Sequence, residues 1–481
     1  MAVEIVEADY LLIGSGAMGM AFADVLIRES EATLAIVDRR GKPGGHWNDA
    51  YPFVRLHQPS AFYGVGSRPL GSGRIDRAGW NAGLYELASG AEVLGYFDQV
   101  LREELLPSGR VRYFPMCHYQ GDGVFTSLLS GETYWVDVRR KVVDGTYMNV
   151  TVPATRAPAY TVDPGVSCVP PNALTQLRHA PAGYVVVGGG KTGIDTCLWL
   201  LERHVDPDRI TWIVPHDAWL LDRAALQPPG APGGKPAAGA LLPFDAILGA
   251  TSTRGLFETL ESQGALLRID PEVWPSRYRC ATVAQAELRE LRRIRHVVRL
   301  GRVRRIGRIC IELDSGTLPT TPDHLHVDCS ANGAEPRPPV PVFSADAITL
   351  QSIRTCQQVF SAALIAHLEV AIGGEAEKNA LSAPVPHPYS DSDWLRVTLA
   401  NVESTLRWAQ CPEIAAWVAE SRLDLSGRVG LVPDTSSMSS AEAAHWGKAL
   451  TEVVARLRAL LRTAEPHVRP GEAGAHSRLS R

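Results

Sequence analysis

The sequence predicts an α/β fold built around two units of the same design, each a short apolar strand, a glycine-rich turn, a helix and a second strand. The first unit lies in residues 8–38 and the second in residues 183–214. Units of this design are typical of Rossmann-type folds. A strand-rich stretch over 111–160 separates the two units, and a helical pattern follows residue 391. We therefore expect two Rossmann-type domains with a β-rich insertion and a helical C-terminal part.

In the first unit, the apolar run 8–13 leads into a glycine turn, and a helical pattern over 20–28 and an apolar run over 33–37 follow. The glycines allow a tight turn, a close approach of backbone amides to a pyrophosphate, and packing of the helix on the strand. The helix N-terminus favours phosphates, and an acid after the second strand can accept hydrogen bonds from ribose hydroxyls. A glycine turn of another α/β fold is the alternative. The predicted dinucleotide-binding residues are Gly14, Ser15, Gly16, Ala17, Met18, Gly19, Asp38 and Arg39.

A second glycine element, Gly44-Gly45-His46-Trp47, follows Asp38 closely. Here the sequence resembles the class B flavoprotein monooxygenases, in which a GGxW element lies beside FAD. Two glycines let a backbone pass close to a flat ring system, and a tryptophan offers it an apolar wall. The alternative is a surface loop with a packing tryptophan. The resemblance implies that Gly45, His46 and Trp47 contact FAD.

The run 56–63 (LHQPSAFY) follows at the place where this family has a segment over the flavin. Relatives often carry an asparagine there that takes part in oxygen activation. Gln58 is nearest to that place by spacing, with His57 beside it. The resemblance makes Gln58 and His57 the candidate catalytic residues, and a loop histidine with ordinary hydrogen bonds is the alternative for His57.

The second unit repeats the design, with an apolar run over 183–187, a helical pattern over 194–203 and an apolar run over 210–214. Two units fit a flavoprotein that takes hydride from a nicotinamide, because each cofactor needs its own pyrophosphate cradle. Lys191 is either a cation near the phosphates or a solvated side chain. A P-loop is excluded because Val185 stands where its first glycine would be. The residues predicted to bind NAD(P)H are Gly188, Gly189, Gly190, Lys191, Thr192 and Gly193.

The end of the run 210–214 bears on the choice between NADPH and NADH. No acid follows directly to hold free ribose hydroxyls, and no arginine follows directly to hold a 2′-phosphate. His216 and Arg223 are the candidates for that phosphate. The family resemblance implies NADPH.

Further along, the resemblance implies that the chain returns to the FAD domain through a strand at 324–328, followed by Asn332 and Gly333. It also implies backbone contacts to the flavin at Leu350 and Gln351. The FxGxxxHxxxW/Y sequence of Baeyer–Villiger enzymes is absent between the two glycine turns, which disfavours that reaction. The expected division is FAD domain 1–168, NAD(P)H domain 169–323, FAD domain 324–390, helical region 391–468 and disordered tail 469–481.

The composition sets further limits. A formal net charge of −4 offers no basic field for nucleic acid. No apolar run reaches the roughly 18 residues of a membrane span, and the N-terminus lacks a signal-peptide pattern. The eight cysteines form no CxxC pair, so we expect no metal site and reduced thiols in a cytoplasmic protein.

These features predict an FAD enzyme, reduced by NADPH, that inserts one oxygen atom from O₂ into a small-molecule substrate. The expected acceptor is an amine nitrogen in bacterial specialised metabolism, and a homo-oligomer is compatible with the sequence. One alternative is an FAD-dependent NAD(P)H oxidoreductase that inserts no oxygen. A second is a non-catalytic flavin-binding protein, which would have no need of a second nucleotide site.

Overall fold

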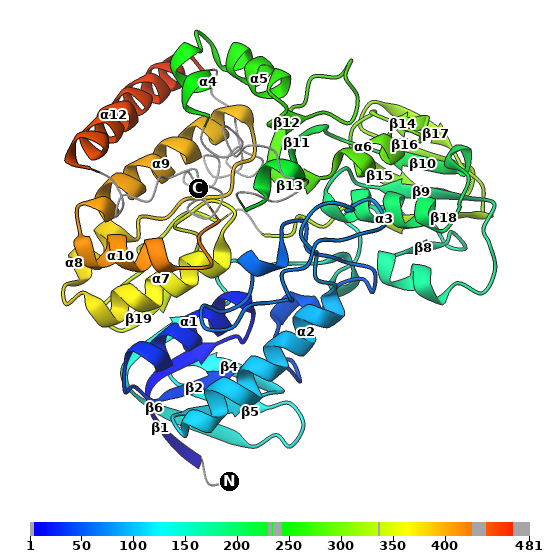
Figure 1. Cartoon of the computed structure of the whole chain (residues 1–481). Helices are drawn as coiled ribbons and strands as arrows, with labels where there is room; N and C mark the ends of the chain where they lie inside the picture. Colours follow the sequence, from blue (N-terminus) through cyan, green and yellow to red (C-terminus); the bar gives the residue numbers. More distant parts are fainter. Residues whose placement is uncertain (1–3, 229–232, 234–242, 335–336, 426–438, 465–481) are drawn as a thin grey trace, which may run out of the picture.

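Figure 1 shows the computed structural model of the chain, which describes residues 4–228, 233, 243–334, 337–425 and 439–464. The N-terminal sheet, the second sheet and a largely helical part occupy three regions of the view, joined by central loops. The fold is the predicted α/β architecture with two Rossmann-type units. The predicted disordered tail over 469–481 lies outside the described residues.

The first sheet has seven strands in the order β3-β2-β1-β6-β5-β4, with β19 also paired to β6. β4 and β5 form an antiparallel extension, and the other strands run parallel. Helices α1 (Ala17–Glu29) and α7 (Gln358–Ala371) pack together in the core over this sheet. The predicted strands and the first helix are confirmed. The strands are β1 (Glu4–Ile13), β2 (Leu34–Val37), β3 (Val111–Phe114), β4 (Cys117–Gly121), β5 (Val124–Ser127), β6 (Thr133–Asp144) and β19 (Ala347–Thr349).

The second sheet has five parallel strands in the order β14-β10-β9-β18-β8. Helices α3 (Lys191–Glu202) and α6 (Gln285–Leu291) contribute to the core on one face. The small sheet β17-β16-β15-β7 contributes to the core on the other face. The strands of both sheets are β7 (Thr161–Val162), β8 (Cys168–Val169), β9 (Gly183–Val187), β10 (Ile210–Ile213), β14 (His296–Val298), β15 (Val303–Ile306), β16 (Cys310–Leu313), β17 (Gly316–Pro319) and β18 (His324–Asp328).

The expected domain boundaries need two corrections. We expected the strand at 324–328 to belong to the first domain, but β18 pairs along its length with β9 of the second sheet. Its apolar side chains Leu325 and Val327 lie in the core of that sheet, which explains the pairing. The second unit also begins before residue 169, because β7 pairs with β15.

A third part combines C-terminal helices with a segment of the second unit. Its core contains an aromatic cluster around Trp219, Phe257, Tyr278 and Trp394. No helix among the described residues is long and apolar enough to cross a bilayer. The elements of this third part are β11 (Ala218–Asp222), α4 (Phe244–Gly249), α5 (Thr253–Ser262), β12 (Leu266–Leu267), β13 (Arg277–Val283), α9 (Asp391–Ala409) and α12 (Ser440–Thr463).

A disulfide joins Cys280 to Cys356, which stand 76 positions apart in the sequence and have their Cα atoms 6.8 Å apart. Our expectation that all eight cysteines are reduced is wrong for this pair. The spacing of the cysteines in the sequence does not predict this disulfide, because only the packing of β13 against the segment before α7 brings the two residues together. The other six cysteines are free.

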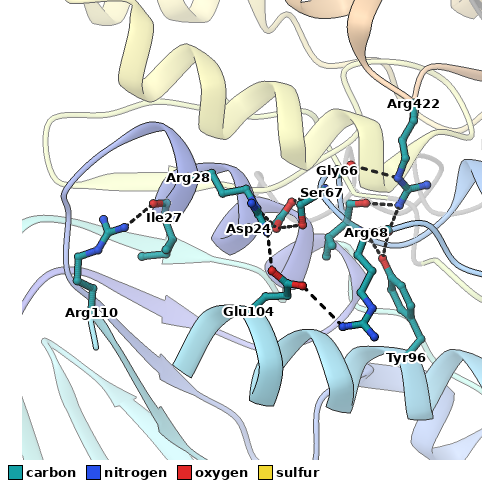
Figure 2. A network of polar contacts seen from close by, with 11 residues as sticks. Asp24, Ile27, Arg28, Gly66, Ser67, Arg68, Tyr96, Glu104, Arg110 and Arg422 are labelled. Carbon is teal, nitrogen blue, oxygen red and sulfur yellow. Dashed lines mark hydrogen bonds and ion pairs between the residues drawn. The ribbon is translucent and has the colours of Figure 1, made fainter. Parts of the chain in front are cut away.

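Hydrogen bonds from Arg422 connect the helical part to the loop over residues 61–68 (Figure 2). Arg422, which follows α10 (Pro412–Glu420), donates to the carbonyl oxygens of Gly66 at 3.2 Å and Arg68 at 2.6 Å. Tyr96, on α2 (Gly90–Gln99), donates to the same Arg68 oxygen at 2.6 Å. Further acceptors of Arg422 are the carbonyl oxygens of Ala61, Tyr63 and Val65.

Candidate functional site

The two glycine turns have the same construction. Gly14 and Gly188 open the turns with φ angles of +93° and +127°, a region that L side chains rarely adopt. A Cβ on Gly19 would strike the carbonyl oxygen of Gly14, and a Cβ on Gly193 would strike that of Gly188. In both turns the last glycine is therefore required for the helix to start directly against the strand.

Asp38 is bound to the first turn. Its Oδ2 accepts hydrogen bonds from the amide and the hydroxyl of Ser15, both at 2.7 Å, and its Oδ1 accepts from the amide of Arg40 at 2.8 Å. The carboxylate is buried, with its residue 5% exposed. A carboxylate has about four acceptor positions, so one remains for a ligand hydroxyl. The neighbouring Arg39 is exposed.

The structure brings the Gly44–Trp47 element onto the first turn. The amide of Gly44 donates to the carbonyl of Ser15 at 2.9 Å, and a Cβ on Gly45 would lie 2.9 Å from the Cα of Gly16. The second glycine is thus needed for contact between two backbones. Buried Trp47 donates through Nε1 to the hydroxyl of Tyr63 at 2.8 Å.

His57 lies between the two units. Burial lowers its pKa to about 3, helped by the nearby charges of Lys191 and Arg223. Its Nδ1 is buried and has no hydrogen-bond partner among the residues that the structure describes. Gln58 is half-buried beside it. The candidate loop therefore reaches the second glycine turn.

A group of hydrogen-bonded side chains that sequence reasoning missed, Tyr51, Asp195 and Lys191, joins the segment just before this loop to the second turn. Tyr51 donates to Asp195 Oδ2 at 2.8 Å, and the same oxygen binds the ammonium of Lys191. Lys191 also donates to the carbonyl of Arg55 at 3.3 Å, and burial raises the pKa of Tyr51. Asp195 stands four residues after Lys191, a helical spacing that could have indicated the ion pair. Lys191 is therefore neither simply solvated nor without a partner.

Arg223, a candidate phosphate ligand, is instead buried and held by partners inside the protein. Its guanidinium donates to the carbonyl of His57 at 3.0 Å, to Asn81 at 3.1 Å and to Glu287 at 2.8 Å. These bonds use three of its five N–H donors, and because the residue is only 2% exposed a cofactor phosphate cannot reach it, so the prediction of Arg223 as a phosphate ligand is wrong. Arg223 fixes the backbone of His57.

His216, the other candidate, lies beside the second turn within a group of arginines. Its carbonyl oxygen is 3.4 Å from the position of a Cβ on Gly189, and its Nε2 is 3.4 Å from Arg277. Burial lowers the pKa of His216, and the charges of Arg277, Arg302 and Arg279 lower it further. Sequence reasoning missed these arginines because all three lie more than sixty residues from His216 along the chain.

The segment directly after β19 is buried at Leu350 and Gln351, whereas the segment after β18 is exposed at Asn332. Leu350 is fully buried, and its amide donates to the carbonyl of Asp144 at the end of β6 at 3.0 Å. The amide side chain of Gln351 binds the backbone of Val340. Asn332 is exposed, and Gly333 adopts a φ of +70°.

Comparison with known proteins identifies relatives over most of the chain. The uncharacterised protein Rv2000 of Mycobacterium tuberculosis strain H37Rv is 54% identical over 422 residues, which cover 87% of this chain and 78% of that protein. The chain belongs to the Rv2000 family. The uncharacterised protein Mb2023 of Mycobacterium bovis, a second match, has the same identity and coverage. No protein-family model matches the chain.

Among solved structures, the matches to this member of the Rv2000 family include two monooxygenases. The flavin-containing monooxygenase from Stenotrophomonas maltophilia is 15% identical, with a TM-score of 0.43 over 76% of this chain and 97% of that chain. A closed crystal structure of cyclohexanone monooxygenase is 14% identical, with a TM-score of 0.47 over 92% and 98%.

In this member of the Rv2000 family, both glycine turns leave space beside the backbone. Among the described residues, a Cβ on Gly190 would meet no atom within 4 Å, and one on Gly16 would meet the Cα of Gly45 at 3.6 Å. Helices α1 and α3 begin immediately after these glycines, so their first amides point toward that space. Each turn is thus open at a helix N-terminus, where an anion is stabilised.

Proposed function

We propose that the chain is an FAD-dependent monooxygenase, reduced by NADPH, that transfers one oxygen atom from O₂ to a small-molecule substrate. The observation that carries this proposal is the pair of open glycine turns in one chain, with the His57 loop reaching from the first unit to the second. Two dinucleotide cradles facing a shared loop suit hydride transfer from one bound cofactor to another.

The first turn would hold FAD. Gly16 and the first amides of α1 would approach the pyrophosphate, and Asp38 would accept from a ribose hydroxyl with its remaining acceptor position. Trp47 and Leu350, both buried close to this turn, would form apolar walls that exclude water. When bound, the flavin would supply the acceptance of hydride and the reaction with O₂.

The second turn would hold NADPH. The space at Gly190 would take the pyrophosphate, since a side chain is absent there. The group His216, Arg277 and Arg302 would receive the 2′-phosphate, because arginine guanidinium groups match phosphate geometry. This group supports the choice of NADPH over NADH on grounds independent of family resemblance.

The loop residues His57 and Gln58 would line the space between the cofactors. The low pKa of His57 keeps its ring neutral at physiological pH, so it can donate or accept a hydrogen bond without adding positive charge. Its unpartnered Nδ1 is available for such a bond. An amine nitrogen is the proposed oxygen acceptor, a reaction that requires no acid–base pair from the protein.

An FAD-dependent reductase that inserts no oxygen is the second candidate. It is favoured by two features, the presence of Gln58 where monooxygenases of the class B type often have asparagine and the absence of the FxGxxxHxxxW/Y sequence. A non-catalytic flavin-binding protein is disfavoured, because it would have no need of the second open turn.

An anaerobic titration of the purified protein, followed by visible absorbance, tests the cofactor assignment. We expect FAD to co-purify and NADPH to bleach it faster than NADH does. A colourless protein that cannot be reconstituted with FAD would overturn the proposal. Turnover of amines under ¹⁸O₂ then separates the two candidates: labelled product supports oxygen insertion, and reoxidation without labelled product supports the reductase.

A further inference from the structure

The Cys280–Cys356 disulfide links two parts of the chain that carry the two proposed cofactor sites. Cys280 lies on β13, the strand that also carries Arg277 beside His216. Cys356 lies in the segment between β19 and α7, which begins with buried Leu350, and it stands two residues before the first residue of α7. The disulfide therefore connects two separate elements, β13 and the segment before α7, rather than two positions of one element.

Both cysteines have unusual backbone conformations. The φ angles are +56° at Cys280 and +58° at Cys356, in the left-handed region that non-glycine residues seldom occupy. Cys280 also coincides with an irregularity in β13, whose register with β11 shifts between Trp219 and Leu221. Such conformations persist where the surrounding structure enforces them, and they gather at functional sites.

The two sulfur positions differ in access. Cys280 is buried, at 8% exposure, whereas Cys356 is half-buried at the edge of the aromatic core. Of the two cysteines, Cys356 is therefore the one with more exposed surface for a small thiol to approach. In a reducing compartment a disulfide persists only as a transient or redox-sensing bond, so an accessible bond is open to exchange there.

We propose that Cys280–Cys356 is a thiol–disulfide site that reacts with low-molecular-weight thiols and controls how firmly β13 is held to the segment before α7. The thiolate of the small thiol attacks Sγ of Cys356 and forms a mixed disulfide, while Cys280 leaves as a thiolate and takes a proton. A second small thiol attacks the mixed disulfide and releases Cys356 as a thiol. Two small thiols are oxidised to one disulfide, and the protein disulfide gains two electrons and two protons.

The consequence for cofactor binding rests on the proposed function. In the oxidised form the bond fixes β13, and with it Arg277, which lies beside His216 near the second glycine turn. Reduction frees β13 from the segment before α7, so the arginine group loses part of its fixed geometry. We expect the reduced protein to bind NADPH at least five-fold more weakly, with NADH binding changed less.

Thiol counting on the full-length protein tests the bond itself, without reference to any cofactor. After denaturation, we expect six titratable thiols in protein treated with glutathione disulfide and eight in protein treated with dithiothreitol. Cys356→Ser, which keeps only the buried Cys280 of the pair, should show seven after either treatment. The matched control Cys411→Ser, at a free and half-buried cysteine, should show five and seven. Eight thiols after the oxidising treatment of the wild type would overturn the proposal.

Two further measurements test the control of β13. The midpoint of thermal unfolding should fall on reduction of the wild type and of Cys411→Ser, and stay unchanged on reduction of Cys356→Ser. In the NADPH titration, equal affinity in the oxidised and reduced forms would overturn the link to the cofactor site. Failure of NADPH to bleach the flavin in both forms would contradict the proposed function instead, while the thiol counts and unfolding midpoints still decide the disulfide proposal.

Discussion

The amide and the hydroxyl of Ser15 donate to the same carboxylate oxygen of Asp38, each at 2.7 Å. The two residues meet because β1 and β2 pair in parallel register, with Ile13 opposite Val37, so both follow the ends of neighbouring strands. The carboxylate thus shapes the first glycine turn before it binds anything. In the proposed holoenzyme it has two tasks, holding the turn and accepting from a ribose hydroxyl.

Replacement of Asp38 should therefore weaken FAD binding strongly. We expect Asp38→Ala to raise the dissociation constant for FAD about 10- to 100-fold, since hydrogen bonds to a charged group are worth about 1.5–3 kcal/mol. Fluorescence titration of the apoprotein with FAD measures this. The control Asp137→Ala, at an exposed position of β6, should bind as the wild type does. Unchanged affinity in Asp38→Ala would show that the first turn is not the FAD cradle.

A substitution at Gly190 should affect cofactor binding without affecting folding. Its Cβ position is open and its φ is −85°, so Gly190→Val should fold with the stability of the wild type. The added methyl groups would occupy the space proposed for the pyrophosphate, so NADPH should no longer bleach the bound flavin. Gly373→Val is the matched control, since its Cβ position is also open but lies beyond α7. Normal NADPH reduction in Gly190→Val would refute the assignment of this cradle.

The arginine group beside His216 should decide the preference for NADPH. Arg277→Ala is expected to weaken NADPH binding about tenfold or more and to leave NADH binding almost unchanged, because only NADPH carries the 2′-phosphate. Steady-state or anaerobic titrations with both cofactors measure the ratio. Arg304→Ala, on β15, is the control because this exposed arginine pairs with Asp314. A parallel loss for both cofactors would point to general damage rather than recognition of the phosphate.

Arg422 should contribute more to stability than an exposed arginine does. Its guanidinium donates to backbone carbonyls of Gly66, Arg68 and others in the loop 61–68, which Arg422→Lys would leave partly unpaired. We expect a loss of about 3 kcal/mol in the free energy of unfolding, measured with urea. Arg254→Lys, in an exposed ion pair with Glu258, should cost less than about 0.5 kcal/mol. Equal effects of the two substitutions would show that the loop does not depend on Arg422.

Half-buried histidines with lowered pKa values should make the protein less stable in acid. Burial lowers the pKa of His46 to about 4 and of His387 to about 4, well below the usual value for histidine. Between about pH 4 and pH 6.5 the unfolded chain binds protons at these positions and the native protein does not, so stability falls as pH falls. Each histidine contributes up to about 1.4 kcal/mol per pH unit in that window.

Urea unfolding at pH 5.5 and pH 7.5 measures this effect in the protein as purified. His387→Asn should lose less stability on acidification than the wild type loses. His118→Asn, at an exposed position of β4, should follow the wild type. An identical pH dependence in all three proteins would contradict the assignment of His387 as a half-buried neutral ring.

Much of the fold follows from local patterns in the sequence. The strands and helices around both glycine turns form where apolar runs, glycines and helical periodicity indicate, within a few residues of the predicted bounds. The strand at 324–328 was assigned to the wrong sheet, because an apolar strand pattern specifies burial and not the partner strand. Pairing depends on packing against residues that are distant in the chain.

The sequence by itself determined the two Rossmann-type units, the glycine turns and the position of Asp38, because each depends on contacts between residues close in the chain. The tertiary structure alone decided that Arg223 holds the backbone of His57, that Arg277 lies beside His216, and that Cys280 meets Cys356. Each of these contacts joins segments more than fifty residues apart. Side-chain identity shows what such a residue can bind, but only the packing of whole elements determines which group lies within reach.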